Sequence, residues 1–190
     1  MMTGPADWDP DSAPPVNQLL PAWDFITGAY TAFTLLAALR HRDATGEGGE
    51  VRIPLGDVAI GTVANSGAMA EMLYRGSDRE RLGNDIWGAL GRDFISGDGK
   101  RFMVAVLTAK QWLGVVEAFG IASQIAALEA KYGVQFANSD HNRFTHRRDL
   151  FDLIQSIASQ HDYGELARRL TAAGCTFERY RTMFEASTDP

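Results

Sequence analysis

Asp24 is the residue whose type and setting in this sequence are best suited to chemistry. It opens the string Asp24-x-x-Thr27-Gly28, at the start of a long apolar run rich in helix-forming residues. The free N–H groups and the dipole of a helix N-terminus favour an anion, so a carboxylate placed there can serve as a nucleophile. An aspartate before an apolar helix ordinarily has another role, because its side chain caps the helix. The residues alone leave both roles open.

Residues 24–41 are predicted to form the helix that positions this carboxylate. Only three threonines interrupt the apolar character between Phe25 and Leu39, so the helix has almost no polar face and is expected to be buried on all sides. A glycine-rich loop ends it. The alternation in residues 50–55 (EVRIPL) then predicts a short strand, and residues 57–74 are predicted to form a second helix.

A small α+β region follows a polar, glycine-bearing connection. Residues 93–96 and 100–107 flank the turn Gly97-Asp98-Gly99, which predicts a β-hairpin because glycine tolerates the positive φ of tight turns. Further helices are predicted at residues 109–119, 122–131, 146–160 and 162–173. The predicted fold is mostly α-helical with a small α+β domain.

The chain is expected to divide into four parts. Residues 1–16 contain four prolines and are predicted to be flexible, whereas residues 17–80 carry the helix that follows Asp24. Residues 81–92 are predicted to be a linker, and residues 93–190 to form the small domain.

Composition excludes several functional classes. The formal charge of −6, from 18 basic and 24 acidic residues without a basic cluster, argues against binding to nucleic acid or to a membrane surface. No apolar run is judged long enough to span a membrane. One cysteine, Cys175, indicates a reducing cytoplasmic setting, and no cluster of residues with metal-ligand spacing is found.

Three strings in order resemble CoA transferase family III, the CaiB/BaiF type. They are Asp24-x-x-Thr27-Gly28, Arg42-x-x-Thr45-Gly46-x-Gly48 before the predicted strand, and Asp98-Gly99 in the predicted hairpin. Gly83-Asn84 also matches a Gly-Asn pair that the family carries between its domains.

The resemblance implies the α/β fold of the family's interlocked dimers. Residues 17–80 would then be part of the large domain, and residues 93–190 the small domain with the start of a segment that returns to the large one. Family members are about twice as long and begin with a CoA-binding half, so this chain is expected to be an internal segment.

The resemblance further implies that Asp24 attacks an acyl-CoA thioester and forms aspartyl-anhydride and aspartyl-CoA intermediates. Within the family the sequence is most similar to the intramolecular CoA-transferring isomerases that act on mesaconyl-CoA. No cofactor would be bound permanently, since CoA arrives as part of the substrate. Expected partners are an acyl-CoA, a dicarboxylate, and either a second copy or a complementing CoA-binding half. Residues expected to contact substrate or CoA are Thr27, Gly28, Gly83, Asn84, Gly88 and Gly91.

Other readings remain open at this point. The chain could be an inactive truncated remnant, or one subunit of a split enzyme, because much of the family's length is missing. An α-methylacyl-CoA racemase of the same family is a further alternative. Racemases use a histidine upstream of the aspartate, whereas the histidines here, at positions 41, 141, 146 and 161, all lie downstream.

Overall fold

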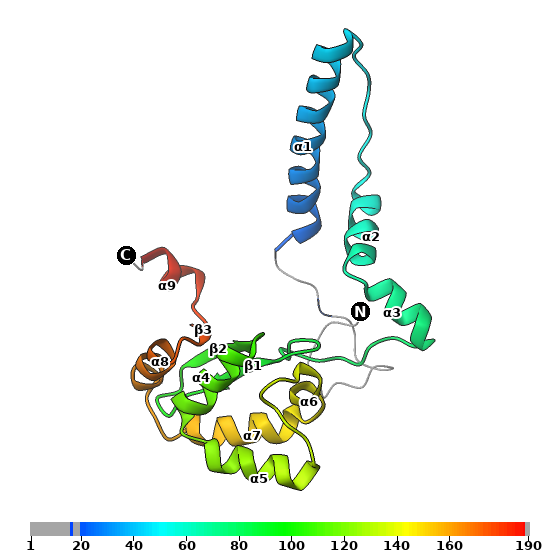
Figure 1. The fold of residues 1–190 in the computed structure, drawn as a ribbon. Helices are drawn as coiled ribbons and strands as arrows, with labels where there is room; N and C mark the ends of the chain where they lie inside the picture. Colours follow the sequence, from blue (N-terminus) through cyan, green and yellow to red (C-terminus); the bar gives the residue numbers. More distant parts are fainter. Residues whose placement is uncertain (1–15, 17–19, 189–190) are drawn as a thin grey trace. The chain divides into compact units, whose positions relative to one another are not determined.

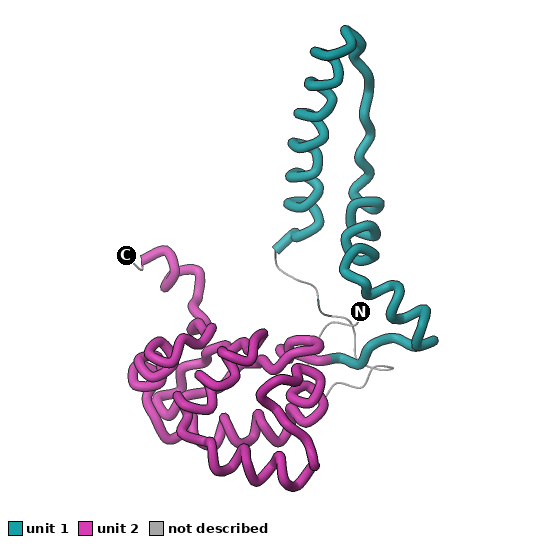
Figure 2. Tube along the Cα trace, in the orientation of Figure 1, with its two compact units in different colours: residues 1–81 teal, residues 82–190 magenta. Residues whose placement is uncertain are grey.

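The structure, a computed structural model, describes residues 16 and 20–188 and divides into two compact units. Unit 1 comprises residues 1–81 and unit 2 residues 82–190 (Figure 2). The division falls at the start of the predicted linker, whose remaining residues belong to unit 2. The expectation for residues 1–16 lies outside the described residues, Val16 excepted.

The described part of unit 1 is helical. It contains α1 (Ala22–Thr45), α2 (Leu55–Asn65) and α3 (Ala68–Arg75) (Figure 1). The first predicted helix is confirmed, although it begins earlier and ends later than expected. Gly46 ends it, because its left-handed φ of 79° takes the chain out of the helical region.

Two predicted elements of unit 1 differ from the structure. Residues 50–54 form no strand, because no neighbouring strand in the described chain pairs with their alternating pattern. The second helix is broken into α2 and α3 at Gly67, whose φ of 78° is incompatible with a continuous right-handed helix.

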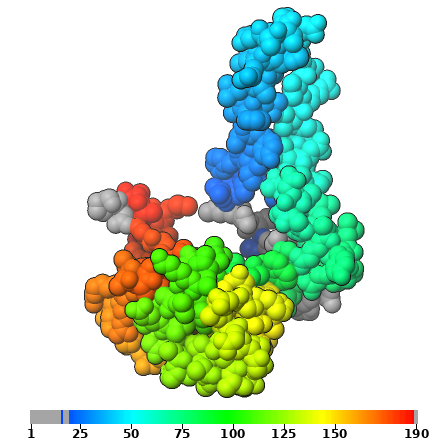
Figure 3. Space-filling view, viewed as in Figure 1, coloured from blue at the N-terminus to red at the C-terminus, as the bar shows by residue number. Residues whose placement is uncertain are grey.

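The helix α1 is exposed rather than buried on all sides. Within the described chain none of its residues is buried, and its main packing partner is α2 (Figure 3, blue and cyan). Its length and composition also suffice for a membrane span, contrary to the expectation from the sequence. That is weak support for a membrane segment, because core helices of soluble proteins pass the same test.

Unit 2 holds the small α+β domain. Its described elements are β1 (Leu90–Ile95), β2 (Arg101–Val106), α4 (Ala109–Phe119), α5 (Ala122–Tyr132), α6 (Asp140–Thr145), α7 (Arg147–Ala158), α8 (Tyr163–Ala172), β3 (Thr176–Arg179) and α9 (Met183–Thr188). The predicted hairpin and the four predicted helices are confirmed. The elements α6, β3 and α9 were not predicted.

The sheet of unit 2 is antiparallel, in the order β1-β2-β3. Phe94 pairs with Phe102 across β1 and β2, and Val104 pairs with Phe177 across β2 and β3. The side chains of these four residues enter one apolar core. The helices α4 and α7 pack against the same sheet. The buried core includes Trp112, Phe119, Leu150, Ile154, Leu166 and Leu170.

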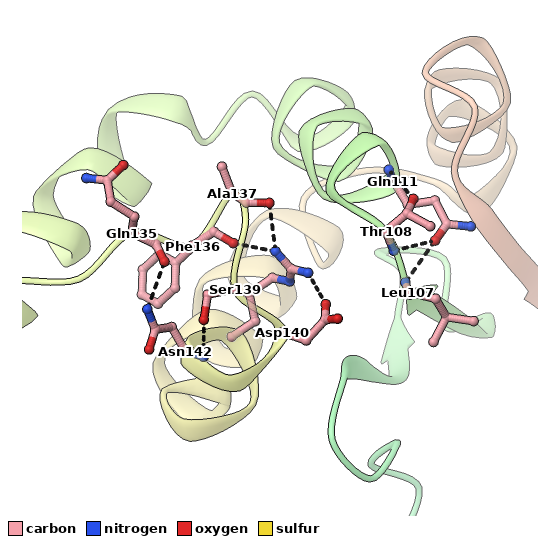
Figure 4. A network of polar contacts seen from close by, with 10 residues as sticks. Leu107, Thr108, Gln111, Gln135, Phe136, Ala137, Ser139, Asp140 and Asn142 are labelled. Atoms are coloured by element: carbon pink, nitrogen blue, oxygen red, sulfur yellow. Dashed lines mark hydrogen bonds and ion pairs between the residues drawn. The ribbon is translucent and has the colours of Figure 1, made fainter.

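The N-terminus of α4 is held by hydrogen bonds, one of which joins it to β3. Thr108 and Gln111 form a reciprocal capping box at its N-terminus (Figure 4). The Gln111 amide also donates to the Thr176 hydroxyl at 2.7 Å, which joins α4 to β3. Gly114 lies so close to the carbonyl of Ala173 that a Cβ would stand 2.5 Å from its oxygen. The absence of a side chain there allows the two segments to meet.

A buried arginine organises the turn before α6. The guanidinium of Arg143 donates to the carbonyl oxygens of Phe136 and Ala137, and it forms an ion pair with Asp140 (Figure 4). Its side chain is only 2% exposed. Because a buried charge is tolerated only with partners, these contacts hold the loop in place.

Candidate functional site

Asp24 lies in the first turn of α1 rather than at its cap. The N-cap is Pro21, and the backbone N–H of Asp24 donates to the Pro21 carbonyl at 3.1 Å. The side chain makes no capping hydrogen bond, so the suggested capping role is wrong. The carboxylate is exposed and has no hydrogen-bond or ion-pair partner among the described residues. Both oxygens are therefore free to react, close to the positive end of the helix dipole.

Thr27 places a hydroxyl one turn from Asp24, on a neighbouring side of the helix. In α1 and α2, Thr31, Thr45 and Thr62 each donate to the carbonyl four residues earlier. The Thr27 hydroxyl is buried and has no such partner in the described part of the chain. A buried hydroxyl without a partner is unfavourable. It is a free donor for an oxygen of a ligand or of Asp24.

Gly28 leaves open space beside the carboxylate. At about 100° per residue, Asp24, Gly28, Thr31 and Leu35 follow one strip of the helix surface. A Cβ at Gly28 would meet no atom within 4 Å outside its own helix backbone. Packing within the described chain therefore gives no reason for a glycine here, although glycine weakens a helix.

Helix position alone does not single out Asp24. Asp57 occupies the same third position of α2, after Pro54, and is also exposed. Its N–H donates to the Pro54 carbonyl at 3.1 Å, as that of Asp24 does to Pro21. The two aspartates form a matched pair for experiment.

The candidate glycines of unit 2 have structural roles of their own. Gly83 and Gly88 adopt left-handed conformations, with φ of 59° and 73°, in the turns before β1. Gly91 lies within β1, where a Cβ would stand 2.5 Å from Cδ1 of Ile86 and 3.0 Å from the carbonyl oxygen of Val104. Side-chain packing therefore accounts for the glycine at 91. Asp24, Thr27 and Gly28 share one helix of unit 1, whereas the other candidates belong to unit 2.

Asn84 contributes to a buried polar cluster that was not predicted. Its amide donates to the carboxylate of Asp93 at 2.9 Å, and the guanidinium of Arg101 donates to the other carboxylate oxygen. Burial alone would raise the pKa of Asp93, but the hydrogen bonds from Asn84 and Arg101 outweigh it and lower that pKa. The sequence feature that could have indicated this cluster is Asp93 itself, because a carboxylate inside a predicted strand needs polar partners when it is buried.

No metal centre is found in the described part of the chain, where no three histidine, cysteine or acidic side chains come together. Two of the histidines engage other groups. His161 contacts Glu165 at 3.1 Å, and His146 stacks on the ring of Tyr132 with 4.1 Å between centroids.

Known proteins resemble this chain over its whole length but are much longer. The family model described as CoA-transferase family III matches residues 1–190. The chain is 40% identical over 190 residues to 2-methylfumaryl-CoA isomerase of Chloroflexus aurantiacus, and covers 45% of that protein.

Solved structures share the fold. A CaiB/BaiF family protein from Brucella suis aligns with a TM-score of 0.69 at 24% identity, over 100% of this chain and 46% of that one. The protein Rv3272 of Mycobacterium tuberculosis aligns with a TM-score of 0.70 at 20% identity, over 96% and 45% of the two chains. At these identities the likeness concerns the fold alone. Because the family match includes every residue, the chain belongs to CoA-transferase family III.

Proposed function

We propose that this segment carries the nucleophile of an acyl-CoA:carboxylate CoA transferase, acting intramolecularly on mesaconyl-CoA. The observation that carries the proposal is the exposed carboxylate of Asp24, free of partners in the described chain at the start of α1. The similarity to a 2-methylfumaryl-CoA isomerase supports the substrate. The chain spans less than half of that relative, so the proposal concerns the complete fold.

The first half of the reaction forms two intermediates in turn. An oxygen of Asp24 attacks the thioester carbonyl, a C–O bond forms as the C–S bond breaks, and CoA leaves as a thiolate. The thiolate then attacks the side-chain carbonyl of the resulting anhydride. An aspartyl-CoA thioester forms and the substrate carboxylate is released.

The second half returns CoA to the other end of the substrate. The second carboxylate of the same dicarboxylate attacks the aspartyl thioester, and the released thiolate attacks the acyl carbon of the new anhydride. Asp24 is regenerated as a carboxylate. Thiolate and carboxylate exchange places without a change in oxidation state or a net proton transfer, so the chemistry requires no permanent cofactor.

Nearby groups would position the intermediates. The free hydroxyl of Thr27 would donate to an oxygen of Asp24 or of the anhydride, and the open space at Gly28 would admit the acyl group. Gly83, Asn84, Gly88 and Gly91 stay candidates for contacts with CoA. Asn84 would contact CoA through its amide oxygen or its second N–H, because one N–H of its NH₂ group already donates to Asp93.

The proposed setting is the cytoplasm, with association as a homodimer or with a complementing CoA-binding half. The second candidate function is an inactive remnant or one subunit of a split transferase. This second candidate is kept because the chain covers only 45% of the relative.

The test is to trap the aspartyl intermediate. The chain is incubated with mesaconyl-CoA and hydroxylamine or borohydride, and its peptides are analysed by mass spectrometry. Modification is expected at Asp24 in the wild type and in Asp57→Asn, and is expected to disappear in Asp24→Asn. Modification of Asp57 as well would show that helix position alone sets the reactivity. No adduct at Asp24, together with no CoA binding, would favour the remnant.

A further inference from the structure

A cavity of about 190 Å³ lies at the free edge of the sheet in unit 2, between β1 and α7. Residues of both elements line it, together with Arg101 of β2. In the described sheet β1 is an edge strand, with β2 as its one neighbour. An edge strand presents backbone N–H and carbonyl groups that no other strand pairs. The cavity therefore combines polar side chains with open backbone groups.

Two outward-facing positions on this edge of β1 already have partners. The carboxamide of Gln155 accepts from the N–H of Ile95 at 3.0 Å and donates to the carbonyl of Ile95 at 2.8 Å. The carbonyl of Gly91 accepts from the N–H of Ile86 at 2.8 Å. Because backbone groups alternate between the two sides of a strand, Asp93 faces the same way as Gly91 and Ile95. Its carbonyl has no partner among the described residues, and Asp93 lines the cavity.

Arg92 presents free hydrogen-bond donors to the cavity. Its guanidinium lies over the ring of Phe151, 5.1 Å from the centroid, and its Nε is 3.7 Å from a carboxylate oxygen of Asp85. The guanidinium makes no hydrogen bond within the described part of the chain, and the side chain is 43% exposed. A guanidinium held from two sides presents its remaining N–H groups as a fixed fork, which matches a carboxylate.

Asp152 supplies the opposite charge from α7. Its carboxylate is exposed, lines the same cavity and has no hydrogen-bond or ion-pair partner among the residues described. The other two charged groups of the cavity neutralise each other, because Arg101 donates to the carboxylate of Asp93. A simple anion at Arg92 would lie close to two carboxylates, and a simple cation at Asp152 would lie close to two guanidiniums. A molecule with both charges complements both free groups.

We propose that this cavity binds a small zwitterion with the functional groups of an α-amino acid. The carboxylate of the ligand accepts hydrogen bonds from Arg92, and its ammonium group donates to Asp152 and to the open carbonyl of Asp93. The rings of Phe94 and Phe151, which meet edge to face with 6.0 Å between centroids, contact a short apolar side chain. All these residues belong to unit 2, so binding there requires no reaction at Asp24.

Titration of the isotope-labelled chain with L-alanine, followed by NMR, tests the proposal. Saturable shifts are expected in the backbone amides of residues 92–95 and in the side-chain amide of Gln155. Propionate lacks the ammonium group of alanine and ethylammonium lacks its carboxylate, so each should bind at least roughly tenfold more weakly. Equal binding of propionate and alanine would mean a simple anion site. That result would overturn the zwitterion assignment, as would the absence of saturable shifts with alanine.

Variants locate the binding groups. Arg92→Met and Asp152→Asn should each weaken alanine binding at least roughly tenfold, whereas Asp152→Asn should not weaken propionate binding, because it removes a carboxylate from the cavity. Arg168→Met, at an exposed position of α8 outside the cavity, is the control and should bind alanine as the wild type does. Melting curves check that each variant folds, and the exposed position of Asp152 keeps the test open if Arg92→Met does not.

The outcome is separable from that at Asp24. Alanine binding that survives in folded Asp152→Asn would contradict the proposal. Asp24→Asn should bind alanine as the wild type does, so the zwitterion site and the proposed reaction can fail independently.

Discussion

The carboxylate of Asp98, in the hairpin turn, accepts a hydrogen bond from the backbone N–H of Tyr163 at 2.9 Å. Tyr163 is the first residue of α8, whose own N-cap Asp162 makes no side-chain capping bond. The hairpin therefore supplies an acceptor to a helix that begins 65 residues later. The N–H of Gly97 also donates to the carbonyl of His161 at 2.8 Å. The Asp98-Gly99 string thus has a structural role in closing unit 2.

Asp98→Asn should destabilise unit 2 in a pH-dependent manner. Hydrogen bonds from the Ser96 hydroxyl and then from the Tyr163 N–H lower the pKa of Asp98 below its usual value. This stabilisation is complete above the unfolded pKa of about 3.9 and is lost as pH falls through the folded pKa. Melting temperatures by circular dichroism should differ between wild type and variant near neutral pH and converge in acid. Asp152→Asn is the exposed control; a difference that persists in acid would contradict the assignment.

Gly28→Ala should separate stability from activity. Alanine gains about 1 kcal/mol of helix propensity over glycine, and its Cβ meets nothing in the described chain. Hydrogen exchange of the backbone amides in α1 should therefore slow. If the acyl group occupies the space at Gly28, the rate of Asp24 adduct formation should fall roughly tenfold, which corresponds to a loss of about 1.4 kcal/mol of binding free energy. Gly61→Ala in α2 is the matched control, since it offers the same helix gain away from Asp24. An unchanged adduct rate in Gly28→Ala would remove Gly28 from the site.

Gly91→Ala should destabilise unit 2 by about 1–3 kcal/mol. The new Cβ would overlap Ile86 and press on the Val104 carbonyl, and such overpacking displaces neighbours in a close-packed region. Urea unfolding measures the change. Gly164→Ala, where a Cβ meets nothing, should be neutral or stabilising. Equal stability of the two variants would contradict the packing role of Gly91.

Arg143→Met should cost about 3–5 kcal/mol of unfolding free energy, because it leaves the Phe136 and Ala137 carbonyls and Asp140 without their partner. Arg148→Met, at an exposed position of α7, should change stability by no more than about 0.5 kcal/mol. Chemical denaturation compares the two. A small loss in Arg143→Met would mean that methionine packing compensates for the lost hydrogen bonds.

Cys175 should report on the opening of unit 2. Burial, and then the nearby charge of Glu117, raise the pKa of its thiol to about 11. Because the thiolate is the reactive form, alkylation by iodoacetamide at about pH 8 should be at least roughly tenfold slower than for a free cysteine. Urea should restore the fast rate. Fast alkylation of the folded chain would show that the segment around Cys175 opens readily.

The sequence was most informative where local chemistry decides the structure. The helix predicted at residues 109–119 coincides with α4, which ends at the glycine stop Gly120. The capping box of Thr108 at its start was not predicted. The hairpin followed from its glycine turn, since Gly99 adopts a φ of 76°. The family strings pointed to Asp24, but its freedom from capping appeared only in the structure, because the helix begins two residues earlier.

Distant partners explain what the sequence did not predict. The short strand β3 exists through its pairing with β2, as Phe177 with Val104, and a four-residue strand has little signal of its own. Residues 50–54 show the reverse case, an alternating pattern with no strand to pair with among the described residues. The Asp93 cluster depends on Asn84 and Arg101, which flank it in the chain but meet it only when the hairpin folds.

Because α1 has no buried side chains, amino-acid substitutions in it should have little effect on the stability of the folded segment. Unit 2 holds the large apolar core, so a substitution such as Phe33→Ser would leave that core intact. Cellular proteases and chaperones, which respond to unfolded chains, would have little reason to remove such a variant. Under the proposed function, genetic drift in α1 is limited by catalysis, and screens for folding or expression alone would miss damage there.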